Sequence, residues 1–128
     1  MHKLSRGIIA MGGVAAIAVG AATAEAASDT VKIGFNAPLT GFAAADGKSA
    51  RLGAELAVEE INAKGGINGK RVELVIYDDQ AKAVQAIPVA KKLIGQDGVK
   101  IAVSGSYSGP TRAAAGVFQE AGIPYISA

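Results

Sequence analysis

Residues 49–79 read SARLGAELAVEEINAKGGINGKRVELVIYDD, a helical pattern that passes through a glycine turn into a strand pattern. Apolar residues recur at helical spacing on one face between Ser49 and Ala63, namely at Ala50, Ala54, Ala57, Val58 and Ile61. The glycines of Lys64-Gly65-Gly66 end this helix, because glycine adopts the left-handed conformation of a helix C-terminus at low cost. From Arg71 to Tyr77 polar and apolar residues alternate, which predicts a strand.

The same alternation of helix and strand continues on both sides of this segment. We predict further strands at residues 31–35, 99–103 and 123–127, and further helices at residues 81–96 and 110–121. Pro88 either places the start of the second helix near Gln85 or kinks that helix, and Pro110 suits the first turn of the third. This order predicts an α/β fold, a parallel sheet with helices on both faces and right-handed crossovers.

The first 26 residues have the pattern of a secretory signal peptide. A basic start with Lys3 and Arg6 precedes an apolar run from Ile8 to Ala22, and small residues lead to Ala26. A membrane-spanning helix needs roughly 20 apolar residues, whereas this run is shorter and contains three glycines. We therefore expect residues 1–26 to be removed near Ala26, and residues 27–128 to be exported.

Charge and composition exclude several classes of function. The chain has 13 Lys and Arg against 11 Asp and Glu, and loss of Lys3, Arg6 and Glu25 with the leader would leave 11 against 10. Such a balance gives no basic patch for nucleic acid. There is no cysteine, and His2 is the only histidine. We therefore expect no metal site, no cofactor and no Ser-His or thiolate catalysis.

Ligands of parallel α/β sheets bind beyond the carboxyl ends of the strands, which here lead into loops at residues 38–47, 78–80 and 104–109. The third loop precedes a helix whose first N–H groups favour a carboxylate. Ser106, Ser108 and Thr111 add hydroxyl groups, and Tyr107 adds a flat apolar face. The sequence thus allows two interpretations: a clamp for a small organic acid, or Ser108 acting only as a helix cap.

The other two loops each allow a catalytic or nucleotide-binding interpretation and a simpler one. Residues 41–49 approach a phosphate-binding P-loop, but they have five residues between the glycines instead of four, and Phe42 obstructs the tight turn. The alternatives are a loop in which Asp46 or Ser49 caps the next helix, or a ligand-facing loop with Phe42 as an apolar wall. For Asp78-Asp79 we prefer a turn role, because adjacent side chains in an extended segment point to opposite sides.

Four phrases of the sequence together resemble one family. They are APLTG at residues 37–41, EINAKGGING at 60–69, YDDQ at 77–80 and SYSG at 106–109. They resemble the N-terminal lobe of the branched-chain amino-acid-binding family of periplasmic proteins. The resemblance implies a two-lobed fold that closes on its ligand and delivers it to an ABC transporter permease in the inner membrane.

The resemblance also implies roles for individual residues. In this family the serine at the position of Ser108 binds the ligand carboxylate. The residues at the positions of Ser106, Tyr107 and Phe42 to Asp46 line the pocket. Amino-acid binders often carry an aromatic residue at the position of Asp46, so the acid here departs from the pattern and disfavours leucine-like ligands. The groups that hold the ligand's ammonium belong to a second lobe, and we expect the chain to be part of a longer protein.

These observations predict an extracytoplasmic solute-binding protein that captures an amino acid or a related small carboxylate, without catalysis and as a monomer. Three alternatives stay open. They are a sensor of the same fold for an amide or organic acid, a doubly wound nucleotide-binding enzyme, and a helix-on-sheet interaction module without a small ligand.

Overall fold

The computed structural model of the protein describes residues 30–127, in which strands and helices alternate strictly along the chain. The predicted signal peptide lies outside these residues. The elements are β1 (Thr30–Ala37), α1 (Ala44–Ala63), β2 (Arg71–Asp78), α2 (Ala83–Gly95), β3 (Ile101–Ser104), α3 (Ser108–Glu120) and β4 (Tyr125–Ser127).

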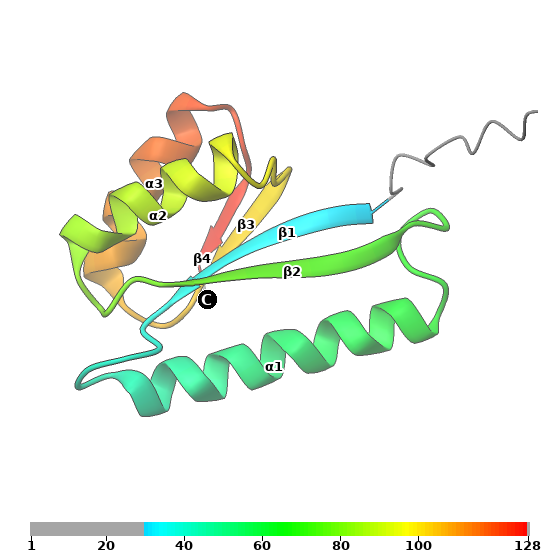
Figure 1. Cartoon of the computed structure of the whole chain (residues 1–128), viewed down its shortest axis with the longest axis horizontal. Coiled ribbons are helices and arrows are strands. Elements are labelled where there is room, and N and C mark those ends of the chain that lie inside the picture. Colours follow the sequence, from blue (N-terminus) through cyan, green and yellow to red (C-terminus); the bar gives the residue numbers. More distant parts are fainter. Residues whose placement is uncertain (1–29, 128) are drawn as a thin grey trace, which may run out of the picture.

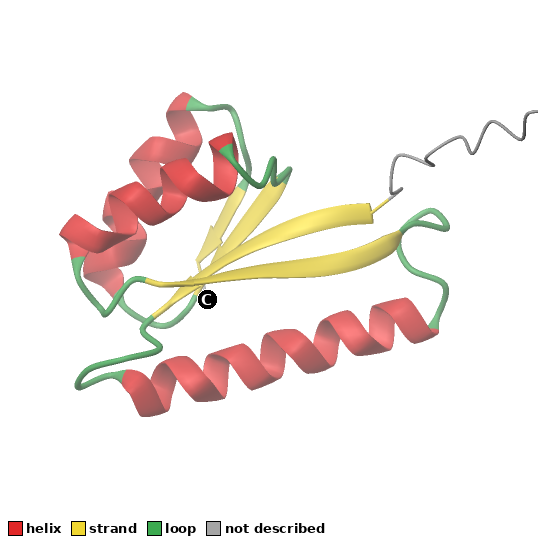
Figure 2. Ribbon diagram, in the orientation of Figure 1, coloured by secondary structure: helices red, strands yellow, loops and turns green. Residues whose placement is uncertain are grey.

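The strands form one parallel sheet in the order β2-β1-β3-β4. Helix α1 covers one face of this sheet, and α2 and α3 lie together on the other (Figures 1 and 2). The predicted α/β fold with helices on both faces is therefore confirmed. From β1 the chain first moves to one side of the sheet, to β2, and then crosses to the other side, to β3. The loops after β1 and β3 consequently flank the point where the winding reverses, which is where such sheets bind ligands.

Three helix boundaries differ from the prediction. Helix α1 starts at Ala44 instead of Ser49, since residues 43–45 are alanines that favour a helix. Helix α3 starts at Ser108, so Pro110 is its third residue and still lies in the first turn, where no intrahelical N–H bond is lost. Helix α2 runs from Ala83 to Gly95, within the predicted range 81–96, and includes Pro88, so the alternative of a start near Gln85 is wrong.

The main hydrophobic core lies between the sheet and the α2–α3 pair. Its members are almost completely buried: Ala86, Ala90, Leu93, Val99, Ala102, Ala114 and Phe118. Small residues let the layers approach closely. A Cβ atom at Gly34 of β1 would lie only 3.2 Å from carbons of Leu93 and Ala102. The close packing fixes α2 and α3 on the sheet.

Helix α1 packs more loosely, along β1 and β2. Its only buried residue is Gly47, where an added Cβ atom would lie 1.8 Å from the carbonyl oxygen of Pro38, so glycine is required. Leu52 and Leu56 are each 56% exposed. Of the face predicted to be apolar, Ala50, Ala54, Val58 and Ile61 are partly buried, but Ala57 is exposed.

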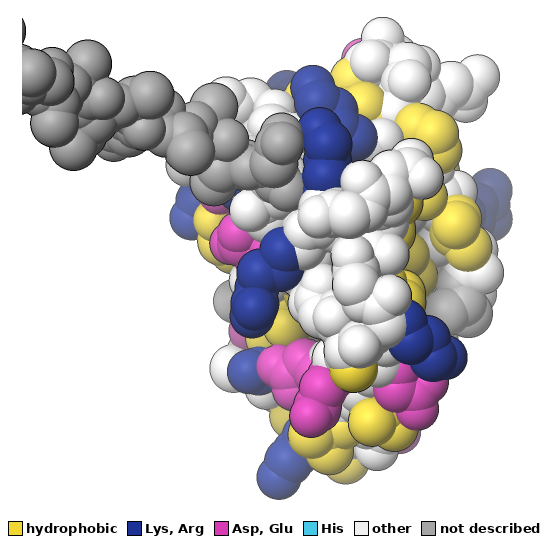
Figure 3. Space-filling model, turned by 90° about the vertical axis from the view of Figure 1, so that its right-hand side faces the viewer, with side chains coloured by type: hydrophobic (Ala, Val, Ile, Leu, Met, Phe, Trp, Pro, Cys, Tyr) yellow, Lys and Arg dark blue, Asp and Glu magenta, His cyan; other side chains and the backbone are white. Residues whose placement is uncertain are grey.

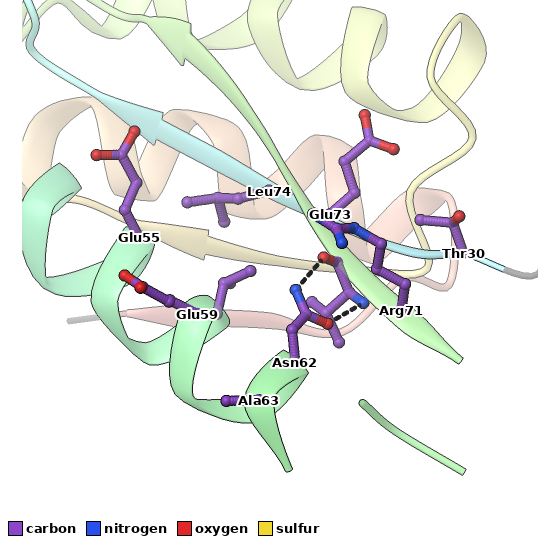
Figure 4. Close-up of a pocket in the computed structure, with 10 residues that line it drawn as sticks. Thr30, Glu55, Glu59, Asn62, Ala63, Arg71, Glu73 and Leu74 are labelled. Carbon is purple, nitrogen blue, oxygen red and sulfur yellow. Dashed lines mark hydrogen bonds between the residues drawn. The ribbon is translucent and has the colours of Figure 1, made fainter. Parts of the chain in front are cut away.

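Asn62, near the end of α1, holds the helix to the edge strand through two hydrogen bonds from its side chain to the strand backbone. Its Nδ2 donates to the carbonyl oxygen of Val72 at 2.8 Å, and its Oδ1 accepts from the Val72 N–H at 2.7 Å (Figure 4). The surrounding hollow between α1 and β2 is lined by charged side chains that include Glu55, Glu59 and Arg71. It reaches Thr30 and Arg71, where the strands begin, and thus lies away from the carboxyl ends of the strands.

Candidate functional site

The loops that follow β1 and β3 lie against each other at the carboxyl edge of the sheet. The N–H of Gly105 donates to the carbonyl oxygen of Asn36 at 2.8 Å. A Cβ atom at Gly105 would lie 2.8 Å from the Cβ of Ala37, so only glycine fits here without a shift. The loop after β3 therefore starts in direct contact with the end of β1.

Three of the six predicted site residues come together above this contact. The hydroxyl of Tyr107 donates to Oδ2 of Asp46 at 2.7 Å. The Tyr107 ring also meets the Phe42 ring edge-on, with 5.8 Å between the centroids and an interplanar angle of 86°. The hydrogen bond to Asp46 raises the pKa of Tyr107, and desolvation and the charge of Asp46 act in the same direction. Phe42 is 82% exposed and so presents an apolar surface beside a carboxylate.

The other three predicted residues lie at the start of α3. Ser108 is the first residue of the helix and is exposed, and the capping position belongs to Tyr107, with no side-chain cap hydrogen bond. The interpretation of Ser108 as a helix cap is therefore wrong. Ser106 is exposed and has a φ of 77°, in the left-handed region. Thr111 is half-buried, and its N–H donates to the carbonyl oxygen of Tyr107 at 3.1 Å.

The first loop does not form a phosphate-binding turn. Gly47 and Lys48, which would follow the phosphate cradle in a P-loop, already lie inside α1. The capping interpretation of Asp46 and Ser49 is also wrong, because α1 starts after Ala43 without a side-chain cap. Asp46 lies in the first helical turn, where a negative charge is favourable, and the Ser49 hydroxyl donates to the carbonyl oxygen of Ala45 at 3.1 Å.

Asp78 ends β2 and Asp79 follows it, and both side chains accept hydrogen bonds from the backbone of the turn that comes next, which confirms their predicted turn role. Asp78 Oδ1 accepts from the N–H groups of Leu39 and Gln80, each at 2.8 Å, and Oδ2 accepts from the Thr40 hydroxyl. Burial acts to raise the pKa of Asp78, but these hydrogen bonds outweigh it and lower that pKa below 3.8. Asp78 thereby fixes the loop that leads from β1 to Phe42.

Sequence analysis missed two polar residues beneath the site, Asn36 and Tyr125. Asn36 Nδ2 donates to Asp79 Oδ2 at 2.8 Å, and the Tyr125 hydroxyl donates to Asn36 Oδ1 at 2.7 Å. Asn36 and Asp79 are each 1% exposed, and burial raises the pKa of Asp79. The signal in the sequence was a single asparagine within the apolar run of β1, since a buried polar side chain needs partners.

Other kinds of site find no support within residues 30–127. No group of three or more acidic or His residues in this part of the chain is arranged to hold a metal ion. None of its helices is long and apolar enough to cross a membrane. Basic and acidic side chains are interspersed at the end of the molecule where β1 and β2 begin (Figure 3).

The fold and the paired loops define a class: a doubly wound α/β lobe, a fold in which ligands generally bind where the winding reverses. The family model for periplasmic binding proteins matches residues 30–128, and the chain belongs to this family. The resemblance to branched-chain amino-acid-binding proteins is confirmed.

The chain is similar to relatives of known name and structure. It is 42% identical over 126 residues to the leucine-, isoleucine-, valine-, threonine- and alanine-binding protein of Pseudomonas aeruginosa, covering 98% of this chain and 32% of that protein. An isoleucine-bound substrate-binding protein of a branched-chain amino acid transporter from Streptococcus pneumoniae superimposes with a TM-score of 0.74 and 44% identity, over 77% of this chain and 28% of that one. The chain thus spans about a third of its relatives' length.

A second solved structure shows that the lobe also occurs with a different ligand. It is a solute-binding protein of an ABC transporter from Rhodopseudomonas palustris in complex with 3,4-dihydroxybenzoic acid. The TM-score is 0.70 at 28% identity, over 77% of this chain and 27% of that one. Both bound compounds are small molecules that carry a carboxyl group.

Proposed function

We propose that residues 27–128 are the N-terminal lobe of an extracytoplasmic solute-binding protein that captures an amino acid or a related small carboxylate. The protein would act in the periplasm as a monomer, after cleavage of the leader near Ala26, and pass its ligand to an ABC transporter permease in the inner membrane. Membership of the periplasmic binding protein family supports this proposal. The ligands named for similar proteins support the ligand class.

One observation carries the proposal: Tyr107 joins the start of α3 to Phe42 and Asp46 across the winding reversal of the sheet. The first N–H groups of α3 and the hydroxyl of Ser108 would hold the ligand carboxylate, since a helix N-terminus favours negative charge. Ser106 and Thr111 would supply further hydroxyl groups. The rings of Phe42 and Tyr107 would form the apolar wall.

Asp46 makes the ligand preference specific. The Asp46 carboxylate next to the carboxylate clamp repels a second negative charge on the ligand. It also disfavours a purely aliphatic side chain, because such a side chain would desolvate the carboxylate without adding a hydrogen bond. We therefore propose that ligands whose side chain carries a hydroxyl or ammonium group bind better than ligands with an aliphatic side chain such as that of leucine.

Capture needs no chemical reaction. A ligand that contacts both lobes binds the closed form more tightly than the open form, so binding shifts the population toward closure. The closed, loaded form is the one a permease would recognise. The function of this chain would be to supply one rigid half of the pocket.

The test is a thermal-shift and calorimetry screen of the protein with both lobes, using amino acids, small carboxylates and aromatic acids. Ser108→Ala should weaken the best carboxylate ligand by ~1.5–3 kcal/mol, the value of a hydrogen bond to a charged group. Ser49→Ala is the matched control, because the Ser49 hydroxyl bonds within α1. A protein that no compound stabilises, or a Ser108→Ala variant with unchanged affinity, would contradict the proposal.

A further inference from the structure

A buried polar network runs across the sheet directly beneath the proposed ligand site. It takes one side chain from each strand or from the residue that follows it: Asp79 after β2, Asn36 from β1, Ser104 from β3 and Tyr125 from β4. Asn36, Asp79 and Ser104 are at most 1% exposed. Buried polar side chains are costly unless they are paired, so this arrangement has a defined set of partners.

The hydrogen bonds of the network all point in one direction, toward Asp79. Tyr125 donates to Asn36 Oδ1 at 2.7 Å, and Asn36 Nδ2 donates to Asp79 Oδ2 at 2.8 Å. The N–H of Ala81 donates to the other carboxylate oxygen at 2.9 Å. A carboxylate that only accepts is ionised, so this direction corresponds to the charged form of Asp79.

The other end of the network reaches the ligand loop. Burial raises the pKa of Tyr125, and its interactions with the side chains of Asn36, Ser104 and Thr111 oppose that rise. Ser104 directly precedes the loop 105–107, and Thr111 lies in the first turns of α3. The Ser104 hydroxyl lies near Tyr125 but makes no hydrogen bond of good geometry within residues 30–127, so it can accept one.

We propose that Asn36 and Tyr125 are positioning residues that couple the protonation of Asp79 to the loop 105–107 and the start of α3. When Asp79 takes one proton from solvent, its new O–H must donate, and the Asn36 amide turns to present Oδ1 to it. Asn36 Nδ2 then donates to the Tyr125 oxygen, and the Tyr125 hydroxyl turns to donate to Ser104. The hydrogen bonds between Asp79, Asn36 and Tyr125 are kept with reversed direction, Ser104 gains one as acceptor, and no other proton is gained or lost.

Few charged groups surround Asp79 that could compensate for a change in its protonation. Asp78, from the same turn, raises its pKa further, and Tyr125 is the titratable group that reaches it from β4. Lys82, the nearest cation to Asp79 in sequence, donates to the Gln80 side chain at 3.1 Å and is exposed. Within residues 30–127 no ion pair to Asp79 is present. Protonation of Asp79 therefore acts on the loop mainly through the hydrogen bond between Asp79 and Asn36.

This inference rests on the proposed ligand role of the loop, but its test needs no ligand. NMR titration of the full chain would follow the side-chain carboxyl carbon of Asp79 and the amides of Gly105, Ser106 and Tyr107 through the acid range. In the native sequence the loop amides should show a step at the pKa of Asp79. Tyr125→Phe keeps the ring that stacks on Phe118 at 4.7 Å and removes only the hydroxyl, so Asp79 should still titrate while the loop loses its step.

Two further variants complete the test. Asp79→Asn should abolish both titrations, and Tyr77→Phe, a tyrosine that packs on the same face of the sheet, should keep both. A loop without a step in the native sequence, or a step that survives in Tyr125→Phe, would overturn the coupling. A failed ligand screen would leave these signals unchanged, so the two proposals fail separately.

Discussion

The two faces of the sheet are packed very differently. The α2–α3 face holds Leu93 and Phe118 at 0% exposure, whereas the α1 face leaves Leu52 and Leu56 at 56%. Alanines on α2 and α3 let these helices contact each other and the sheet, while α1 packs mainly on β1 and β2. The proposed ligand loops join the two faces. The loop after β3 leads into the closely packed face, and the loop after β1 leads into the loosely packed one.

The largest expected difference between the faces comes from Phe118. Phe118→Ala should lower the free energy of unfolding by ~3–5 kcal/mol, because it empties a closed core. Urea unfolding followed by circular dichroism measures this loss. Phe42→Ala is the matched control and should change stability by less than ~0.5 kcal/mol, since the Phe42 ring is 82% exposed. Equal losses in the two variants would contradict the comparison.

A smaller effect is expected from Asn62, which replaces apolar packing on the α1 face with two hydrogen bonds. Asn62→Ala should cost ~1–3 kcal/mol, because Val72 would keep a buried N–H and C=O without partners. Glu59→Ala, one turn earlier on the exposed surface, should stay close to the native value. If Asn62→Ala proves neutral, α1 is held by contacts other than this clamp.

Asp78 and Asp79 should make the stability of the protein depend on pH in opposite directions. The lowered pKa of Asp78 gives stability that is present above 3.8 and lost as the pH falls through its folded pKa. The raised pKa of Asp79 gives stability that is present below 3.8 and lost as the pH rises through its folded pKa. Unfolding of Asp78→Asn and Asp79→Asn across the acid range should show each slope disappear separately. Identical pH profiles for the two variants would refute this assignment.

The smallest effect is expected from Leu56. Leu56→Ala should change the free energy of unfolding of this chain by about 0.5 kcal/mol or less, because the side chain is more than half exposed. Leu93→Ala, the same substitution in the closed core, provides the contrast. A loss at Leu56 as large as that at Leu93 would show that the α1 face is packed as tightly as its opposite.

The sequence predicted the fold because each element has a local pattern. The alternation at Arg71–Tyr77 and the glycines after α1 depend only on neighbouring residues, and both elements lie where expected. The start of α1 was missed because Gly47 suggests a loop. Only the contact of Gly47 with Pro38 explains a glycine inside the helix.

The proposed site was predicted less completely. The loops at the carboxyl edge follow from the order of the elements, and Tyr107 meets Phe42 and Asp46 there. The network of Asn36 could not be predicted, because its partners lie 43 and 89 residues away in the sequence. No local pattern carries such long-range pairings.

Ser106 has a backbone φ of 77°, which glycine adopts freely and serine adopts at a cost of order 1 kcal/mol. A serine has fewer backbone conformations available in the unfolded chain than a glycine would have, so it loses less conformational freedom when the bend forms. In the proposed ligand role, a bend that is formed before binding would lose little further conformational freedom on binding. A loop that is preorganised in this way would favour slow dissociation of the ligand, and binding would not require a slow rearrangement of the loop.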